Sequence, residues 1–323
     1  MYHGFVHDGQ AAPHERQAAQ LEIGKFKQQL DYLKAHHNVV PIEAVIAHYR
    51  DGQSLPEHPV VITVDDGYAS FYHLALPLLV EANLPAAVFL TTNFIDKKEL
   101  LWPDRLEYAV QRSHADGVCL CIAGRSYTLG LRTPTERAQN LIHLKQLARQ
   151  LENTARIAMI QELERQAGIS LETAPTLPAH LQPMEWGEVT EAAETGIVSI
   201  GSHTASHPVL TNCSKAVMHT EMLNSKITIE RNLGRVCEQF CYPFGTRNDF
   251  SQVTRQLVKE AGYTSALTTV VGLNNAHSDV FALRRYMVDG RADWNGFLAR
   301  VNGFLGYPAD VASRGFGWWR RHG

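Results

Sequence analysis

A run of five β-branched residues stops abruptly at two adjacent carboxylates and a glycine, within residues 60–67. The run predicts a strand over 60–64 that is buried on both faces, as in a parallel sheet. Gly67 allows a sharp turn that can direct Asp65 and Asp66 to one mouth, where their like charges need compensation. In barrels and open α/β sheets the carboxyl ends of strands carry the functional sites. The alternative is an ordinary turn in which one aspartate caps the next helix.

A second apolar strand, predicted over 196–200, is followed by a polar loop that contains His203 and His207. Their spacing of four residues would place both imidazoles on one side of a helical turn. Two histidines and one carboxylate form a common transition-metal site that leaves positions open for water and substrate. The chain has 16 histidines, so a chance pair of solvated loop histidines is the alternative.

Composition fits a globular enzyme. With 323 residues and 45% apolar content, the chain can bury one large core and carry an insertion. A net charge of −3 gives no reason to expect nucleic acid or an anionic membrane as partner. There is no apolar run long enough for a transmembrane helix, and five cysteines without redox or zinc spacing fit a reducing compartment. The lack of a signal segment predicts a cytoplasmic location, although a leader upstream of Met1 would leave the same sequence.

Strands and helices alternate in most of the chain, which predicts a parallel (β/α) barrel. Further helices are expected at 20–36, 42–49, 70–82 and 253–261, and further strands at 39–41, 86–90, 239–243 and 263–269.

Residues 96–183 depart from this alternation. They predict a β-hairpin from 118–122 and 127–131, followed by two charged amphipathic helices within 133–166. An insertion of this length usually covers an active-site mouth or makes an oligomer contact, and we expect a cap; the oligomeric state stays open. Trp102 and Trp186 could stack on sugar rings, with core packing as the commoner alternative. The aromatic and basic segment 315–322 is expected to dock against the domain, with a membrane or partner contact as the alternative.

Three motifs occur in an order that resembles the polysaccharide deacetylases of the NodB-homology group, carbohydrate esterase family 4. They are Thr-Val-Asp-Asp-Gly at 63–67, Ser-His-Thr-Ala-Ser-His at 202–207 and Tyr-Pro-Phe-Gly at 242–245. The resemblance covers roughly residues 1–95 and 185–300. It implies a distorted (β/α) barrel with a mainly helical insertion at 96–183 inside a single domain, 1–323. It also implies a metal-dependent N-deacetylase that acts on N-acetylated sugars of a surface polysaccharide or its precursor.

The resemblance also implies roles for individual residues. Asp66, His203 and His207 would hold a divalent metal, foremost Zn, with Co, Ni, Mn or Fe as alternatives. Asp65 would be the general base that takes a proton from the attacking water.

The third motif would line the substrate pocket through Tyr242, Pro243 and Phe244, with the Phe244 backbone N–H donating to the oxyanion. Here the chain departs from the family pattern, because Cys241 stands where relatives carry an arginine that holds the base. Arg284 or Arg285 is the expected replacement, with a surface ion pair as the alternative for either.

The proton donor for the leaving amine is the second departure. Relatives use a histidine in a C-terminal Leu-x-His strand, and none stands out after residue 270. The opening Met-Tyr-His-Gly-Phe-Val instead resembles a permuted subgroup that includes exopolysaccharide deacetylases of the poly-N-acetylglucosamine type. The last strand of a closed barrel neighbours the first, so an N-terminal strand can fill the same slot. We therefore expect His3 to be the general acid, with His277 as the alternative.

Two other functions stay open. One is hydrolysis of a small non-sugar amide or cyclic imide, as in some relatives. The other is a catalytically silent protein that binds carbohydrate or assists its assembly. The intact Asp65, Asp66, His203 and His207 argue against silence, whereas Cys241 and the missing C-terminal histidine leave it open.

Overall fold

The computed structural model describes residues 1–9, 19–97, 99–169, 177–288, 290 and 293–304. The aromatic and basic segment 315–322 lies outside these residues. No helix in these ranges is both long and apolar enough to cross a membrane.

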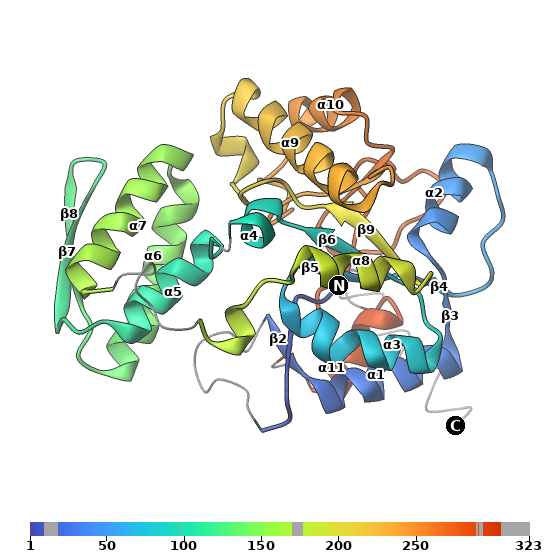
Figure 1. The fold of residues 1–323 in the computed structure, drawn as a ribbon, viewed down its shortest axis with the longest axis horizontal. Coiled ribbons are helices and arrows are strands. Elements are labelled where there is room, and N and C mark those ends of the chain that lie inside the picture. Colours follow the sequence, from blue (N-terminus) through green and yellow to red (C-terminus); the bar gives the residue numbers. More distant parts are fainter. Residues whose placement is uncertain (10–18, 98, 170–176, 289, 291–292, 305–323) are drawn as a thin grey trace.

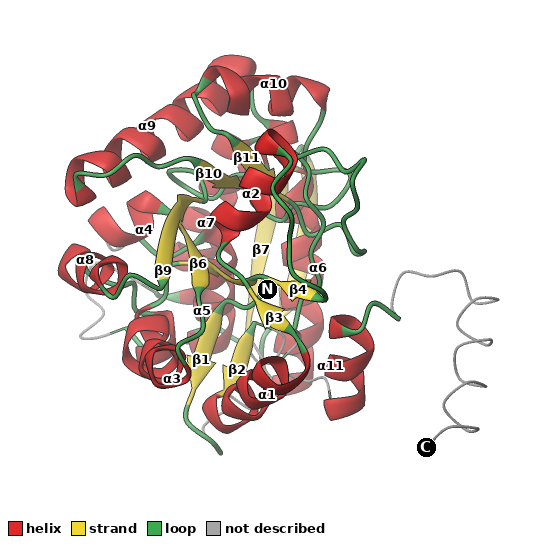
Figure 2. Cartoon of the chain, turned by 90° about the vertical axis from the view of Figure 1, so that its right-hand side faces the viewer, coloured by secondary structure: helices red, strands yellow, loops and turns green. Residues whose placement is uncertain are grey.

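A curled sheet of five parallel strands forms the centre of the molecule (Figure 2). The strands lie in the order β11-β10-β9-β6-β5. Their bounds are β5 Ile62–Asp66, β6 Ala86–Leu90, β9 Val198–Ser202, β10 Gln239–Cys241 and β11 Ser265–Leu267. Each coincides with or overlaps a strand expected from the sequence, and all three family motifs follow or end these strands.

Both faces of the sheet are buried, which explains the β-branched runs. In β6, Val88 and Leu90 pack in the cluster that includes the surrounding helices, while Ala87 and Phe89 join a second cluster with Cys241 and other side chains of the neighbouring strands. Phe89 fills its place only because β9 carries Gly201, where an added Cβ would lie 2.6 Å from the Phe89 ring. The two sets lie on opposite faces of the sheet because successive side chains of a strand point in opposite directions.

The chain's first residues close the sheet into a barrel. Tyr2 pairs in parallel with Val64 of β5, and the Met1 nitrogen donates to the Tyr286 carbonyl at 3.0 Å. On the far side, Leu283 pairs with Leu267 of β11. The ring therefore runs from β11 through the segment after it, across Met1 and Tyr2, to β5. This confirms the predicted distorted (β/α) barrel.

Helices and short strand pairs surround the barrel (Figures 1 and 2). The helices are α1 Ile23–His36, α2 Ile42–Asp51, η1 Phe71–Ala75, α3 Leu76–Ala82, α8 Trp186–Glu194, η3 Leu210–Asn212, α9 Lys215–Leu233, α10 Gln252–Glu260 and α11 Trp294–Val301, and the strand pairs are β1 Gly4–Val6 with β2 Gln20–Glu22 and β3 Asn38–Val39 with β4 Pro59–Val60. The helix expected over 20–36 begins three residues late, because residues 20–22 pair with β1. The helix expected over 70–82 begins as a π-helical turn.

The insertion forms a separate lobe, on the left in Figure 1. It comprises α5 Trp102–Arg112, the hairpin β7 Gly117–Ile122 and β8 Arg125–Gly130, α6 Pro134–Gln150 and α7 Asn153–Ala167, whereas α4 Thr92–Asp96 and η2 Ala179–Leu181 pack against the barrel. The predicted hairpin and helix pair are therefore present. α6 begins at a capping box between Thr133 and Glu136. The lobe packs around its own apolar cluster, which includes Leu144 and Leu163 and reaches the barrel at Val209.

We predict that Leu163→Ala lowers the free energy of unfolding by about 2–5 kcal/mol, because it leaves a cavity in the core of the lobe. Leu163 is fully buried there. Ile142→Ala on the neighbouring helix is the matched control, since Ile142 is 60% exposed and should cost well under about 1 kcal/mol. Urea denaturation followed by circular dichroism measures both; equal losses would contradict a packed core in the lobe.

Candidate metal and hydrolytic site

The turn after β5 brings the two carboxylates to the same end of the barrel. Successive residues of a strand point to opposite faces, so Asp65 and Asp66 would diverge in a regular strand. Asp66 itself has a φ of +80°, and Gly67 continues the turn at +98°. A positive φ is costly for a residue with a side chain. The bend therefore begins at Asp66, one residue before the glycine from which we expected it.

His203 and His207 lie close together, with ring centroids 4.9 Å apart, but not on a helix. The expected helical turn is wrong. Thr204 at φ +71° and His207 at φ +56° form an irregular loop instead. The Thr204 hydroxyl accepts a hydrogen bond from the His207 N–H at 3.0 Å, which holds the second histidine in place. The short polar side chains between the histidines make this local loop competitive with a helix.

Sequence reasoning missed a residue that supports this loop. Glu221 on α9 accepts hydrogen bonds from the backbone N–H and the hydroxyl of Ser206, at 2.8 and 2.6 Å. The contact spans 15 residues and joins the loop to a helix. Nothing in the periodicity of α9 distinguishes this glutamate from solvent-exposed ones.

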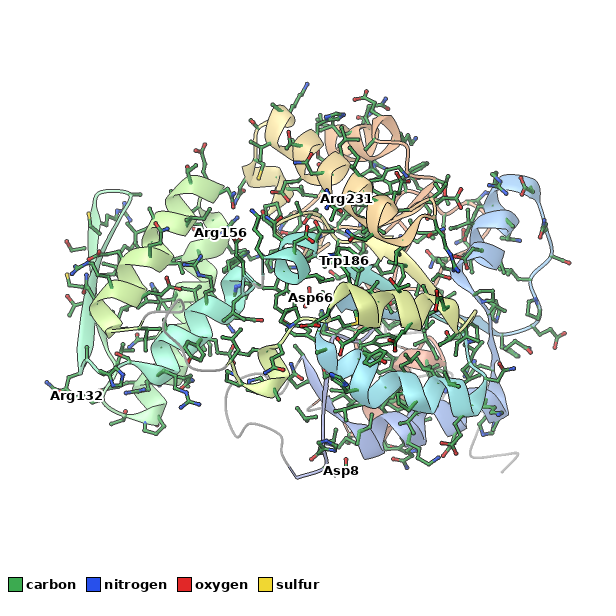
Figure 3. All side chains as sticks on the ribbon, in the orientation of Figure 1. Asp8, Asp66, Arg132, Arg156, Trp186 and Arg231 are labelled. Carbon is green, nitrogen blue, oxygen red and sulfur yellow. The ribbon has the colours of Figure 1, made fainter. Side chains whose placement is uncertain are left out.

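Asp66, His203 and His207 form a compact and buried donor set. Asp66 Oδ1 lies 3.7 Å from His203 Nε2 and 3.5 Å from His207 Nε2, and one ligand atom from each residue lies within 4.8 Å of the others. One carboxylate oxygen and two imidazole nitrogens are suitable ligands for Zn and neighbouring divalent metals. Figure 3 shows Asp66 on the side of the barrel that faces the inserted lobe. The residues present therefore fit a divalent metal.

The state of the imidazoles agrees with this fit. Burial holds the pKa of His203 below its usual range and that of His207 well below it, so both rings are neutral. His203 Nδ1 lies 2.7 Å from the Cys241 carbonyl. A proton on Nδ1 satisfies that contact and leaves the Nε2 lone pair directed to Asp66, as in many metal sites.

A second group, Asp65, His203 and Cys241, also brings its ligand atoms within 4.8 Å. It fits a metal less well. Burial raises the pKa of the Cys241 thiol well above its usual range, so it is not a thiolate. Both oxygens of Asp65 are already held by a cation.

That cation is Arg285, which forms a buried bidentate ion pair with Asp65. Nη1 and Nη2 donate to the two carboxylate oxygens at 2.8 and 2.7 Å, and Nη2 also contacts Cys241 Sγ at 2.9 Å. The adjacent Arg284 is exposed and instead contacts the loop around Asn274. Arg285 thus approaches Asp65 from another segment and lies against Cys241, the position where relatives carry the arginine.

The charge of Asp65 reflects two opposing effects. Burial alone would raise its pKa, but the charge and hydrogen bonds of Arg285 outweigh burial and hold the pKa well below its usual range. Asp65 therefore stays ionised at every physiological pH.

The Tyr-Pro-Phe-Gly segment contributes backbone and one ring to the site. Phe244 has a φ of +60°, and its ring centroid lies 4.9 Å from that of His207. Its N–H makes no hydrogen bond within the described ranges. Gly245 is required there, since a Cβ would lie 2.8 Å from the Thr269 nitrogen. Pro243 is buried.

Tyr242 differs from the expectation. Its side chain is fully buried, stacks on Phe250 and donates a hydrogen bond to the Phe281 carbonyl at 3.0 Å. The Tyr242 side chain therefore belongs to the core and does not line a substrate pocket. An aromatic residue at a strand end can face either the core or a pocket, and contacts with Phe250 and Phe281 place Tyr242 in the core.

His3 lies at the mouth of the barrel. Tyr2 exchanges hydrogen bonds with Thr63 and Asp65 at 2.8 and 3.0 Å, so the register places His3 beside Asp65. The His3 charge influences the titration of both Asp65 and His207. His277, by contrast, is exposed, on a loop whose Asn275 carbonyl is held by Tyr49 of α2.

The two tryptophans have different surroundings. Trp102 is buried in the core of the lobe, with its ring centroid 5.5 Å from that of Phe244. Trp186 is half-buried and donates a hydrogen bond to Asp96 at 2.6 Å. Trp102 therefore packs in the core of the lobe, and Trp186 packs against the edge of the barrel core.

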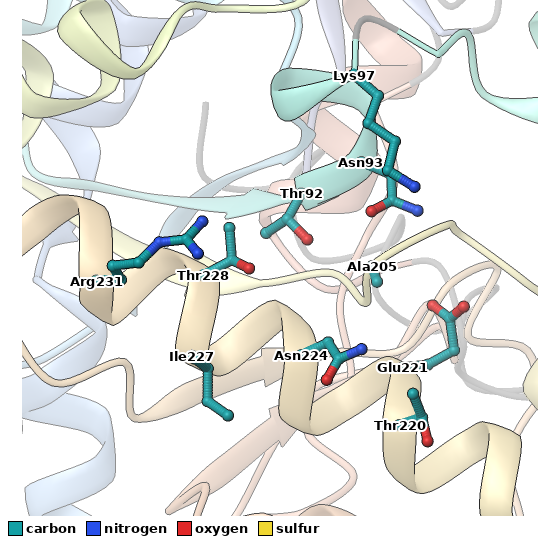
Figure 4. A pocket seen from close by; sticks show the side chains of 10 residues that line it. All are labelled: Thr92, Asn93, Lys97, Ala205, Thr220, Glu221, Asn224, Ile227, Thr228 and Arg231. Carbon is teal, nitrogen blue, oxygen red and sulfur yellow. The ribbon is translucent and has the colours of Figure 1, made fainter.

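A polar groove with a volume of about 450 Å³ lies between α4 and α9 (Figure 4). It contains none of the donor triad, and it meets the histidine loop only at Ala205. Its lining carries hydroxyl, amide and charged groups, and it includes Thr92, Asn93, Lys97, Thr220, Glu221, Asn224, Thr228 and Arg231. The groove therefore adjoins the loop that carries His203 and His207 but does not include the donor triad.

The family model for polysaccharide deacetylases matches residues 52–266, a span that contains the carboxylate pair, both histidines and the Tyr-Pro-Phe-Gly segment. The chain belongs to the polysaccharide deacetylase family. This is a family of hydrolytic deacetylases whose substrates are acetylated carbohydrates. No curated protein sequence matches this deacetylase.

Solved structures share the fold at low sequence identity. The Streptococcus pyogenes deacetylase PplD, in complex with acetate, is 17% identical, with a TM-score of 0.60 over 93% of this chain and 96% of its own. A de-N-acetylase from Aggregatibacter actinomycetemcomitans is 18% identical, with a TM-score of 0.57 over 92% and 96%. IcaB from Ammonifex degensii is 15% identical, with a TM-score of 0.58 over 93% of each chain. These similarities support the barrel fold across most of the chain.

We predict that Arg285→Met destabilises the protein by about 3–5 kcal/mol at pH 7, because it leaves Asp65 buried and unpaired. The native pKa of Asp65 is lowered, so the pair stabilises the fold above about pH 4 and its effect is lost as the pH falls through the native pKa. The deficit should therefore shrink in acid. Arg284→Met, on the exposed neighbour, is the matched control. Denaturant titrations from pH 3 to 7 test this, and a deficit that does not depend on pH would contradict the assignment.

Proposed function

We propose that this protein is a metal-dependent N-deacetylase that hydrolyses the acetamide of N-acetylated sugars in a surface polysaccharide or its precursor. The observation that carries the proposal is the buried Asp66, His203 and His207 donor set beside the ionised Asp65, in a member of the deacetylase family. The whole of residues 1–323 is proposed as one deacetylase domain, with 96–183 as an inserted lobe that caps the mouth.

Asp66, His203 and His207 would hold the metal, and Zn suits the donor set best, with Co, Ni, Mn or Fe as alternatives. When bound, the metal would lower the pKa of a water ligand and polarise the acetamide carbonyl. The protein's part is to supply neutral imidazoles, and burial keeps both in that form.

Asp65 would orient the attacking water and accept its proton. The carboxylate lies on the residue next to the ligand Asp66, and the register of Tyr2 places His3 beside it. Arg285 keeps Asp65 charged but also makes it a weak base, since a lowered pKa reduces proton affinity. Asp65 can take the proton only from a water that is already acidified.

The backbone N–H of Phe244 would donate to the oxyanion of the tetrahedral intermediate. The residue is held at positive φ, and Thr269 donates a hydrogen bond to its carbonyl, so the N–H is positioned before substrate arrives. Pro243 fixes the approach of the chain to it.

His3 would then protonate the departing amine. Its position on the segment that completes the barrel brings an imidazole to the mouth occupied by Asp65 and His207. The distant, exposed His277 offers no comparable position.

We expect the purified protein to carry about one equivalent of divalent metal and to release acetate from N-acetylglucosamine oligomers. Asp66→Ala should lose both, because one of three ligands is gone, whereas Asp51→Ala, on an exposed aspartate, should keep both. Elemental analysis and an acetate assay measure this. Metal without acetate release would favour another amide as substrate, and no metal after incubation with Zn, Co or Ni would favour a silent carbohydrate-binding protein.

We expect His3→Ala to lower kcat by about 10²–10⁴ while metal content is unchanged, because a general acid contributes about this much to the rate. His277→Ala is the matched control and should retain full activity. The ratio of acetate release to bound metal separates the two effects. Full activity in His3→Ala would show that another group protonates the amine.

A further inference from the structure

Arg156 of α7 carries a buried charge that the rest of the described chain does not neutralise. The side chain is 1% exposed, and its Nη2 donates a hydrogen bond to Asn153 Oδ1. Nε and Nη1 are buried as well, and no acceptor for them exists among the described residues. A buried guanidinium with two unsatisfied nitrogens is costly, so it indicates a partner that binds there.

The carboxylates of the described residues do not supply this partner. Glu221 influences the titration of Arg156 but forms no ion pair with it, and its two oxygens accept hydrogen bonds from Ser206. Burial lowers the pKa of Arg156, as expected for a cation that lacks a close counter-ion.

Arg149, on the preceding helix of the same lobe, is a natural comparison. It also lies over an aromatic ring, 4.7 Å from the centroid of Phe244, but it forms an ion pair with the buried Asp249 at 2.6 Å. Of these two ring-stacked arginines, Arg149 is paired with a carboxylate and Arg156 has none among the described residues. Figure 3 shows Arg156 on the lobe and Asp66 on the facing side of the barrel.

Trp102 adds a second unpaired donor. Its ring lies beneath Arg156, with the guanidinium carbon 5.0 Å from the ring centroid, and its indole Nε1 is buried with no acceptor in the described part of the chain. The Trp102 ring touches Phe244, and Phe244 touches His207. The unsatisfied donors of Arg156 and Trp102 are therefore linked to His207, a proposed metal ligand, through the rings of Trp102 and Phe244.

We propose that Arg156 and Trp102 form a binding site for a carboxylate next to the hydrolytic centre. The proposal rests on the proposed function, which brings carbohydrate and acetate to this mouth. Nε and Nη1 of Arg156 and Nε1 of Trp102 would donate to the carboxylate oxygens, with charge-assisted hydrogen bonds from the guanidinium. Two sources have this chemistry: an acidic sugar beside the N-acetylated one, and the acetate that the reaction releases.

The test compares Arg156→Met with Arg149→Met in the full-length, metal-loaded protein. One arm measures kcat/KM for neutral N-acetylglucosamine oligomers and for oligomers in which N-acetylglucosamine alternates with glucuronate. A second arm measures the inhibition constant of acetate and the rise in Tm that sodium acetate produces over sodium chloride at equal ionic strength. Metal content and the rate with neutral oligomers report on the proposed function separately, since neither needs the carboxylate site.

Arg156→Met should weaken either the kcat/KM preference for the glucuronate oligomer or the inhibition by acetate about tenfold or more, as expected for a lost charged hydrogen bond. Loss of the preference for the glucuronate oligomer identifies an acidic sugar as the ligand, and a raised inhibition constant with a lost Tm shift identifies acetate. Arg149→Met should keep both effects.

Stability gives a second readout. Removing an unpaired buried charge should leave Tm unchanged or higher in Arg156→Met, whereas Arg149→Met should lower it by stranding Asp249. If Arg156→Met folds and binds metal but keeps the wild-type oligomer preference, acetate inhibition and Tm shift, the proposal is overturned. A lowered Tm with those properties intact would make Arg156 a structural residue and would overturn it too.

Discussion

The ion pair between Asp65 and Arg285 joins parts of the chain 220 residues apart, and the barrel's functional end is organised around it. Besides Asp65, the guanidinium donates to the Thr63 hydroxyl and the Thr268 carbonyl, and so ties β5 to the segment that follows β11. Two buried charges are expensive to desolvate, and only paired geometry with further hydrogen bonds offsets that cost. The same contacts that hold the barrel closed also keep Asp65 ionised beside the donor triad.

Backbone strain is concentrated at this end of the molecule. Of the seven non-glycine residues with positive φ in the described ranges, four lie at the site, namely Asp66, Thr204, His207 and Phe244. Each costs on the order of 1–3 kcal/mol, so the surrounding packing and hydrogen bonds must hold them. These residues lie together: Asp66 Oδ1 is 3.5 Å from His207 Nε2, and the ring centroids of His207 and Phe244 are 4.9 Å apart.

Local patterns predicted much of this fold. The β-branched run at 60–64 and the apolar run at 86–90 mark strands buried on both faces, and the regular apolar spacing of the helices marks the layer around them. Predictions failed where the conformation of a loop or side chain depends on specific contacts that periodicity does not reveal. The histidine spacing suggested a helical turn, yet Thr204 and Glu221 stabilise a loop, and Tyr242 faces the core because Phe250 and Phe281 surround it. The arginine missing at Cys241 was expected to be replaced by Arg284 or Arg285, and it is Arg285 that pairs with Asp65 from another segment.

The sequence by itself determined the chemical groups available and the strand ends that carry them, because side-chain type and periodicity are local properties. Carboxylates and imidazoles at the ends of buried strands already indicated a metal site, and the resemblance of the three motifs to a known family implied hydrolysis. Tertiary structure alone decided which arginine meets Asp65, that Tyr242 faces the core, and that Arg156 lies buried without a counter-ion among the described residues. These depend on closure of the barrel and docking of the lobe, which bring together residues whose separation along the chain carries no local signal.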